Sequence, residues 1–280
     1  ENENFIIECY GKTIDEKSVY LRITEYTPYF FVEIPKRWKE FEIKKFMYYV
    51  NSKVYGKYQN SIISYDVVKK HKLYGFTAGK RFKFIRLVFN TNTAMKKYSW
   101  IFTSKHKIYG LENNQPTKYQ IYESNIPPML RFMHIRDINA CGWLKVSKYS
   151  KLPKGEYNTK IAIEARWMDV IGLEDTSICK IKIASFDLEC TSGDGSFPQA
   201  TRKSDKIIQI GTTFSYNGDE ECYFKHIITL GSCAPIEGAT VESYDDECDV
   251  ILAWQKMINK QDPDIITGYN IYGFDNKYLH

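Results

Sequence analysis

At 280 residues the chain is long enough to hold two domains, and its 43% hydrophobic and 26% charged residues are ordinary for a globular protein. No stretch approaches the roughly 18 consecutive apolar residues that a membrane helix needs, and residues 1–4 lack the basic-then-apolar pattern of a signal peptide. This composition excludes a membrane-spanning helix, and we expect an intracellular protein with no membrane contact.

The net charge of +5 divides unevenly along the chain. Residues 181–280 carry eight Lys and Arg against sixteen Asp and Glu, which gives −8, so the first 180 residues carry +13. A basic half suits a polyanion such as nucleic acid, because phosphate neutralisation dominates that affinity. An acidic half that also meets nucleic acid needs divalent cations to mask its carboxylates.

The first 176 residues show mostly strand patterns. Residues 19–24 alternate apolar and polar side chains and residues 30–34 repeat the alternation, which predicts a β-meander. Residues 38–50 place apolar side chains at helical spacing, which predicts an amphipathic helix. Further strands are expected at residues 81–89, 118–122 and 161–167. We therefore predict one α+β domain rich in β-strands over residues 1–176.

Residues 177–280 show a clearer order of elements. Three antiparallel strands are predicted at residues 181–189, 206–214 and 221–229. A helix from Ser243 to Pro263, a short buried strand and a second helix from about Phe274 follow. The order βββαβα is that of the RNase H-like exonuclease fold, in which the fourth strand lies parallel beside the first. We therefore predict a partial α/β RNase H-like (DnaQ-like) domain over residues 177–280.

Two acidic residues lie on the first of these strands. Asp187 and Glu189 are two positions apart, so their side chains project from the same face. Without a cation the two carboxylates repel each other, whereas Mg²⁺ or Mn²⁺ turns them into a set of hard oxygen ligands. An isolated Asp-x-Glu pair is most often two solvated acids on an exposed strand, so the pair needs a second element to indicate a site.

The second element is Asp275, which follows the short strand that should pair with the first. In that topology the strand end brings Asp275 within reach of Asp187 and Glu189. Two metal ions about 4 Å apart at such carboxylates activate a water and stabilise a leaving 3′ oxygen. The alternatives are a helix N-terminal acid for Asp275 and a turn residue for Asn270.

Residues 185–190 (Ser-Phe-Asp-Leu-Glu-Cys) and residues 266–275 resemble the first and second exonuclease motifs of the family-B DNA polymerases. The segments at residues 233–239 and 262–264 are similar to the delta-type branch of that family. Shorter fragments that resemble the family lie at residues 27–30, 73–76, 122–125 and 131–133. The resemblance covers nearly the whole chain, and the two exonuclease motifs with their spacing are its specific part.

This resemblance implies the N-terminal and proofreading portion of a replicative DNA-directed DNA polymerase, which hydrolyses mispaired 3′ nucleotides with two Mg²⁺ or Mn²⁺ ions. It implies that Asp187, Glu189 and Asp275 are catalytic metal ligands. It further implies that Asn270 and Phe274 support the frayed primer end, and it makes Phe197 a candidate to stack on a base. The third exonuclease motif and the polymerase site are expected beyond His280.

The implied partners are DNA primer-template and single-stranded 3′ ends, with a sliding clamp and other replication proteins bound through regions beyond this chain. The implied location is the nucleus or a viral replication site. Richness in Lys, Ile, Asn and Tyr indicates an AT-rich genome, which fits a large DNA virus as the source.

Basic and aromatic residues alternate in the basic half, at residues 69–72 and 80–86. Such a surface can grip phosphates and stack bases, while a strand with one buried and one solvated face gives the same pattern. Two other functions also remain open for the chain. One is a stand-alone 3′→5′ exonuclease on DNA or RNA, and the other is a non-catalytic nucleic-acid-binding module.

Overall fold

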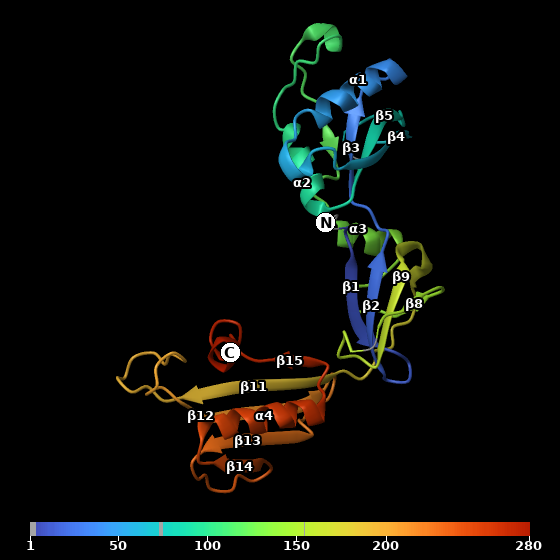
Figure 1. Ribbon diagram of the computed structural model, residues 1–280. Helices are drawn as coiled ribbons and strands as arrows, with labels where there is room; N and C mark the ends of the chain where they lie inside the picture. The colour runs from blue at the N-terminus through green and yellow to red at the C-terminus, as the bar shows by residue number, and fades with distance from the viewer. Residues whose placement is uncertain (1–3, 73–74, 154) are drawn as a thin grey trace. The chain divides into compact units, whose positions relative to one another are not determined.

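The computed structural model describes residues 4–72, 75–153 and 155–280 (Figure 1). Two predictions fall partly outside these ranges. Residues 1–3 belong to the segment that lacks a signal-peptide pattern, and residues 73–74 belong to the family-like fragment at residues 73–76. The chain forms two compact units, Glu1–Ser177 and Ile178–His280. Within the described ranges, no helix has the length and apolar character needed to span a membrane.

One sheet of the first unit has the strand order β4–β5–β3–β6. Alternate side chains of β3 (Tyr29–Ile34) and β5 (Phe82–Phe89) are buried in one core with the apolar faces of α1 (Glu40–Asn51) and α2 (Asn92–Ile101). Figure 1 shows both helices beside this sheet. The other elements here are β4 (Ile62–Lys70), β6 (Ile121–Tyr122) and the 3₁₀ turns η1 (Gly56–Tyr58) and η2 (Glu112–Asn114).

A different sheet of the first unit, in the order β1–β2–β9–β8, packs with α3 (Pro128–Ile135) around a separate core. Its strands are β1 (Ile7–Lys12), β2 (Ser18–Thr24), β8 (Ser150–Lys151) and β9 (Ile161–Arg166). Nearby are the paired strands β7 (Leu144–Val146) and β10 (Val170–Gly172) and the turn η3 (Trp167–Asp169).

The predicted β-meander is wrong, although both of its strands exist. β2 pairs with β1 and β9, whereas β3 pairs with β5 and β6 in the other sheet. The physical reason is that alternation specifies which face of a strand is buried and does not specify its partner. The two strands bury their apolar faces in different cores.

The second unit is built on a five-stranded sheet in the order β14–β13–β12–β11–β15. As predicted, β11 (Lys182–Cys190), β12 (Ile207–Tyr216) and β13 (Phe224–Leu230) are antiparallel, and β15 (Ile265–Thr267) lies parallel beside β11. The Lys182 amide donates to Asp264 Oδ2 at 2.8 Å and the Asp264 amide donates to the Lys182 carbonyl at 2.9 Å. These reciprocal bonds fix the register of the parallel pair.

The crossover helix α4 (Glu247–Gln261) begins later than the predicted Ser243. That serine belongs to β14 (Thr240–Tyr244), an additional strand parallel to β13. The Asp246 carboxylate then caps the helix by accepting the Cys248 amide. Figure 1 shows α4 lying along the sheet, and its apolar face shares a core with Phe186 and Leu188 of β11.

Candidate metal and nucleic-acid site

The alternation of β11 separates a buried face from an acidic face. Phe186 and Leu188 are buried in the core under α4, and the Phe186 ring lies 5.0 Å from the Trp254 ring of α4. Asp187 and Glu189 are therefore turned to the opposite face, where both are exposed. The structure thus confirms that the two carboxylates share one exposed face of the strand.

Asp275 reaches the same strand from the first residue of α5 (Asp275–Leu279). Asp275 is only 2% exposed, and its Oδ1 accepts a hydrogen bond from the backbone amide of Leu188 at 3.1 Å. The bonded amide lies between Asp187 and Glu189 in the chain. One oxygen of Asp275 is therefore committed to fixing α5 on β11, at the centre of the Asp-x-Glu pair.

The turn before α5 requires close approach of the backbone to β11. A Cβ at Gly268 would overlap the carbonyl oxygen of Phe186, so only glycine fits there. Asn270 adopts a left-handed conformation with φ 54°, and its carbonyl accepts the amides of Gly273 at 2.8 Å and Phe274 at 3.3 Å. Asn270 is thus a turn residue in this structure, with its side chain on the exposed surface.

Phe197 and Phe274 come together although they belong to separate segments. Their ring centroids are 5.0 Å apart in an edge-to-face arrangement. Phe197 is 71% exposed, whereas Phe274 is half-buried at the start of α5. An exposed aromatic ring therefore lies next to the segment that carries Asp275.

Two further side chains lie in this neighbourhood. Burial raises the pKa of the Cys190 thiol to about 11, and the charges of Glu247, Asp275 and Glu189 act in the same direction. Burial likewise raises the pKa of the Tyr278 phenol to about 12. The thiol is therefore protonated at neutral pH, which makes it unsuited to nucleophilic catalysis.

Sequence reasoning missed Cys190 and Tyr278. Helical spacing was a usable signal for Tyr278, because residues three positions apart share one side of a helix and Asp275 is three positions before it. Periodicity gave no comparable signal for the contact between Phe197 and Phe274.

The carboxylates do not form a closed metal cage. In the part of the chain that the structure describes, no three His, Cys, Asp or Glu side chains are grouped closely enough to hold a metal ion. The predicted convergence of Asp187, Glu189 and Asp275 on metal therefore stays a prediction. The donor set suits a hard divalent ion, because Mg²⁺ is usually held by one or two carboxylates together with substrate phosphates.

The basic cluster of the first unit is partly engaged within the unit. Lys72 Nζ lies 2.7 Å from Glu33 Oε1 and 4.0 Å from the centroid of the Phe82 ring. Lys70 Nζ lies 4.5 Å from the centroid of the Phe31 ring. These lysines cover aromatic rings of the sheet, so they are anchored as well as charged.

Comparisons with known proteins agree with this architecture. The family model described as "DNA polymerase family B, exonuclease domain" matches residues 119–280, which begins inside the first unit. A DNA polymerase of Acanthamoeba polyphaga mimivirus is 43% identical over 294 residues, covering 100% of this chain and 17% of that protein. The DNA polymerase delta catalytic subunit of Dictyostelium discoideum is 31% identical, over 98% of this chain and 26% of that protein.

A solved structure shows the same fold. The family B DNA polymerase from the hyperthermophilic archaeon Pyrobaculum calidifontis matches 99% of this chain with a TM-score of 0.64 at 19% identity. The match covers 30% of that polymerase, so the chain spans less than a third of each of these relatives. The likeness confirms the predicted fold class, a strand-rich α+β region followed by an exonuclease-like α/β domain.

Proposed function

The chain belongs to the family-B DNA polymerases, and on this premise we propose that Ile178–His280 is part of a metal-dependent 3′→5′ exonuclease that removes mispaired 3′ nucleotides during replication. The observation that carries the proposal is the arrangement on β11. Two exposed carboxylates flank the Leu188 amide, and Asp275 is bonded to that amide. Acids that are left exposed on one face beside a buried acid are suited to bind cations.

Exonuclease domains of this family require divalent metal in general, and we assign the ligands to Asp187, Glu189 and Asp275. Two Mg²⁺ or Mn²⁺ ions, when bound, would polarise a water and stabilise the leaving 3′ oxygen. The exposed Asp187 and Glu189 would hold an ion whose remaining coordination sites would be filled by substrate phosphates. Asp275 would hold the site in place, because its side chain accepts the Leu188 amide and so fixes α5 against β11.

The nucleic-acid contacts are assigned to the segment around α5. Phe274 and the Asn270 turn would support the frayed primer end, while the exposed ring of Phe197 would stack on its last base. DNA primer-template would be the substrate of the whole enzyme, with a sliding clamp and other replication proteins as partners. Its site of action would be the nucleus or a viral replication site.

A double substitution tests the assignment. Asp187→Ala with Glu189→Ala should lower Mg²⁺-dependent digestion of a 5′-labelled single-stranded oligonucleotide by at least about 100-fold, since losing even an outer partner of a metal ligand costs roughly 10- to 100-fold. The matched control is Asp219→Ala with Glu221→Ala, the same residue types at the same spacing on an exposed turn. Both should be assayed in the longest form of the protein that its gene encodes.

Equal digestion by the parent and by the β11 double variant would remove these carboxylates from catalysis. A parent that binds DNA but never digests it would favour the non-catalytic alternative. The stand-alone nuclease is less well supported, because the matched relatives carry the name DNA polymerase.

A further inference from the structure

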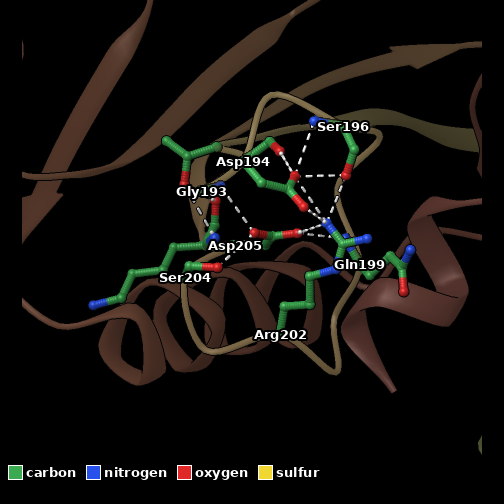
Figure 2. Close-up of polar contacts among 10 residues, drawn as sticks. Gly193, Asp194, Ser196, Gln199, Arg202, Ser204 and Asp205 are labelled. Carbon is green, nitrogen blue, oxygen red and sulfur yellow. Dashed lines mark hydrogen bonds and ion pairs between the residues drawn. The ribbon is translucent and has the colours of Figure 1, made fainter.

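The loop of residues 191–206 connects β11 to β12 and carries Phe197. Its two ends are tied together, because the Thr191 amide donates to the Lys206 carbonyl at 2.8 Å and the Lys206 amide donates to Thr191 Oγ1 at 3.1 Å. The first and last residues of the loop therefore lie side by side where it leaves the sheet. Its interior is organised by charged side chains, as Figure 2 shows.

Asp205 lies inside this loop with its side chain 0% exposed. Its Oδ1 accepts the Gly193 amide at 3.0 Å and the Ser204 hydroxyl at 2.9 Å, and its Oδ2 accepts the Gln199 amide at 3.0 Å (Figure 2). One carboxylate thus bonds the backbone on both sides of Phe197. Because these backbone donors hold its charged form, the pKa of Asp205 is lowered.

Arg202 adds further contacts to those of Asp205, and we call the contacts of these two side chains the brace of the loop. Arg202 Nη1 lies 3.0 Å from both carboxylate oxygens of Asp194, 2.6 Å from Ser196 Oγ and 3.6 Å from Asp205 Oδ2. Asp194 in turn accepts the Ser196 amide at 2.9 Å. The residue before Phe197 is therefore fixed as well.

The brace also depends on close packing between the two sides of the loop. A Cβ at Gly193 would overlap the side chain of Ser204, the residue next to Asp205. The Phe197 ring of the loop also contacts the ring of Phe274, the residue directly before α5. The loop is thus built against the helix that begins at Asp275.

We propose that Asp205 is a positioning residue that presents the exposed Phe197 ring, next to Phe274, to the unpaired base at a DNA 3′ end. The inference rests on the proposed exonuclease function. The ring of Phe197 is exposed and free to contact a ligand. The backbone on either side of it is held by Asp205 through the amides of Gly193 and Gln199. A ring ordered before binding loses less conformational freedom when the base arrives, which strengthens binding.

The test measures binding and turnover separately in the longest form of the protein that its gene encodes. The probe is a single-stranded oligonucleotide with 2-aminopurine at its 3′ end, whose fluorescence is quenched by stacking. It is titrated with Ca²⁺ in place of Mg²⁺ so that the end stays intact. The variants are Asp205→Asn, Phe197→Ala and their combination, and Asp219→Asn is the control for loss of one negative charge at an exposed position.

Asp205→Asn and Phe197→Ala should each reduce the quenching and raise Kd and KM by about 5- to 100-fold, the range for losing one stacked base, with kcat at saturating DNA within about twofold. The double variant should be no worse than Phe197→Ala, because both changes remove the same contact. Asp219→Asn should match the parent. A folded Asp205→Asn protein with parental quenching and KM, or effects that multiply in the double variant, would overturn the proposal.

Where Asp205→Asn does not fold, Arg202→Gln decides the question by the same readouts, since it weakens the brace without altering the buried carboxylate. Parental quenching and KM in Arg202→Gln would then overturn the proposal. Failure of the exonuclease assignment appears elsewhere, as Mg²⁺-dependent digestion that persists when Asp187 and Glu189 are both Ala. The Ca²⁺ titration involves no hydrolysis, so the two failures are distinguishable.

Discussion

The acidic face of β11 and the loop of residues 191–206 are neighbours in the chain, yet they use carboxylates in opposite ways. Asp187 and Glu189 are exposed on the strand. Asp205 is buried, and its oxygens accept two backbone amides and a hydroxyl. A carboxylate whose bonds are completed within the protein holds structure in place, whereas one that is left exposed beside a buried acid can bind a ligand.

The largest expected effect is a loss of nuclease activity without a loss of stability, when both exposed acids of β11 are replaced. Asp187→Asn with Glu189→Gln keeps the side-chain shapes and should lower digestion by at least about 100-fold. Because both side chains are exposed, the free energy of unfolding should change by less than about 0.5 kcal/mol. Urea unfolding and a nuclease assay on the same preparation check this. A large loss of stability would show that these acids are structural, like Asp205.

Asp275 combines the two roles and should respond to substitution in both. Asp275→Ala leaves the Leu188 amide without its acceptor, which should cost about 1–3 kcal/mol of unfolding free energy. Asp275→Asn keeps an acceptor oxygen, so it should recover most of that stability while activity stays low. Urea denaturation of both variants measures the difference. Equal stability of the two variants would mean that the amide bond contributes little.

The brace in the loop should be sensitive to acid. Hydrogen bonds donated by the Gly193 and Gln199 amides lower the pKa of Asp205, and bonds donated by Ser196 lower the pKa of Asp194 to about 2. Groups with lowered folded-state pKa contribute stability above the ordinary carboxyl value of about 3.9, and that contribution is lost as the pH falls through the lowered pKa. The parent should therefore lose stability more steeply than Asp205→Asn below about pH 4.

Urea unfolding midpoints measured between neutral pH and about pH 2 test this prediction. Curves for the parent and for Asp205→Asn should converge toward low pH. Curves that remain parallel over the whole range would show that Asp205 does not hold the loop through its charge.

The smallest effect is expected in the basic unit. If its lysines contact single strands, reversing the charge of Lys69, Lys70 and Lys72 should flatten the log–log dependence of DNA affinity on salt by about 0.7 per lost phosphate contact. The pair between Lys72 and Glu33 predicts that Lys72 contributes least. Fluorescence anisotropy at several salt concentrations measures the slope. An unaltered slope would assign these lysines to a solvated face.

The sequence predicted correctly those features that depend on the residue pattern within one element and on the order of elements. The strands β11 and β12, the parallel partner β15 and the shared face of Asp187 and Glu189 all follow from period-two alternation and chain order. Strand partners did not follow, because pairing depends on which core each strand reaches, as the separation of β2 from β3 shows. β14 was not predicted, because it contains Ser243, and serine is a residue type that commonly begins a helix.

The site was predictable in its residue types and less so in its contacts. The Asp-x-Glu spacing identified the acidic face, but the bond from the Leu188 amide to Asp275 depends on how closely the turn at Gly268 approaches β11. The brace around Asp205 has no periodic signature, because its partners are backbone amides of an irregular loop. Such contacts require the folded chain.

Metal binding by the exposed carboxylates is the central claim, and a Mn²⁺ titration monitored by electron paramagnetic resonance tests it most directly. The chain should be titrated with a single-stranded oligonucleotide bound, as the parent, as Asp187→Ala with Glu189→Ala, and as the control Asp219→Ala with Glu221→Ala. We expect the parent and the control to bind Mn²⁺ alike and the β11 double variant to lose that binding. Equal Mn²⁺ binding by all three proteins would contradict the assignment of Asp187 and Glu189 as metal ligands.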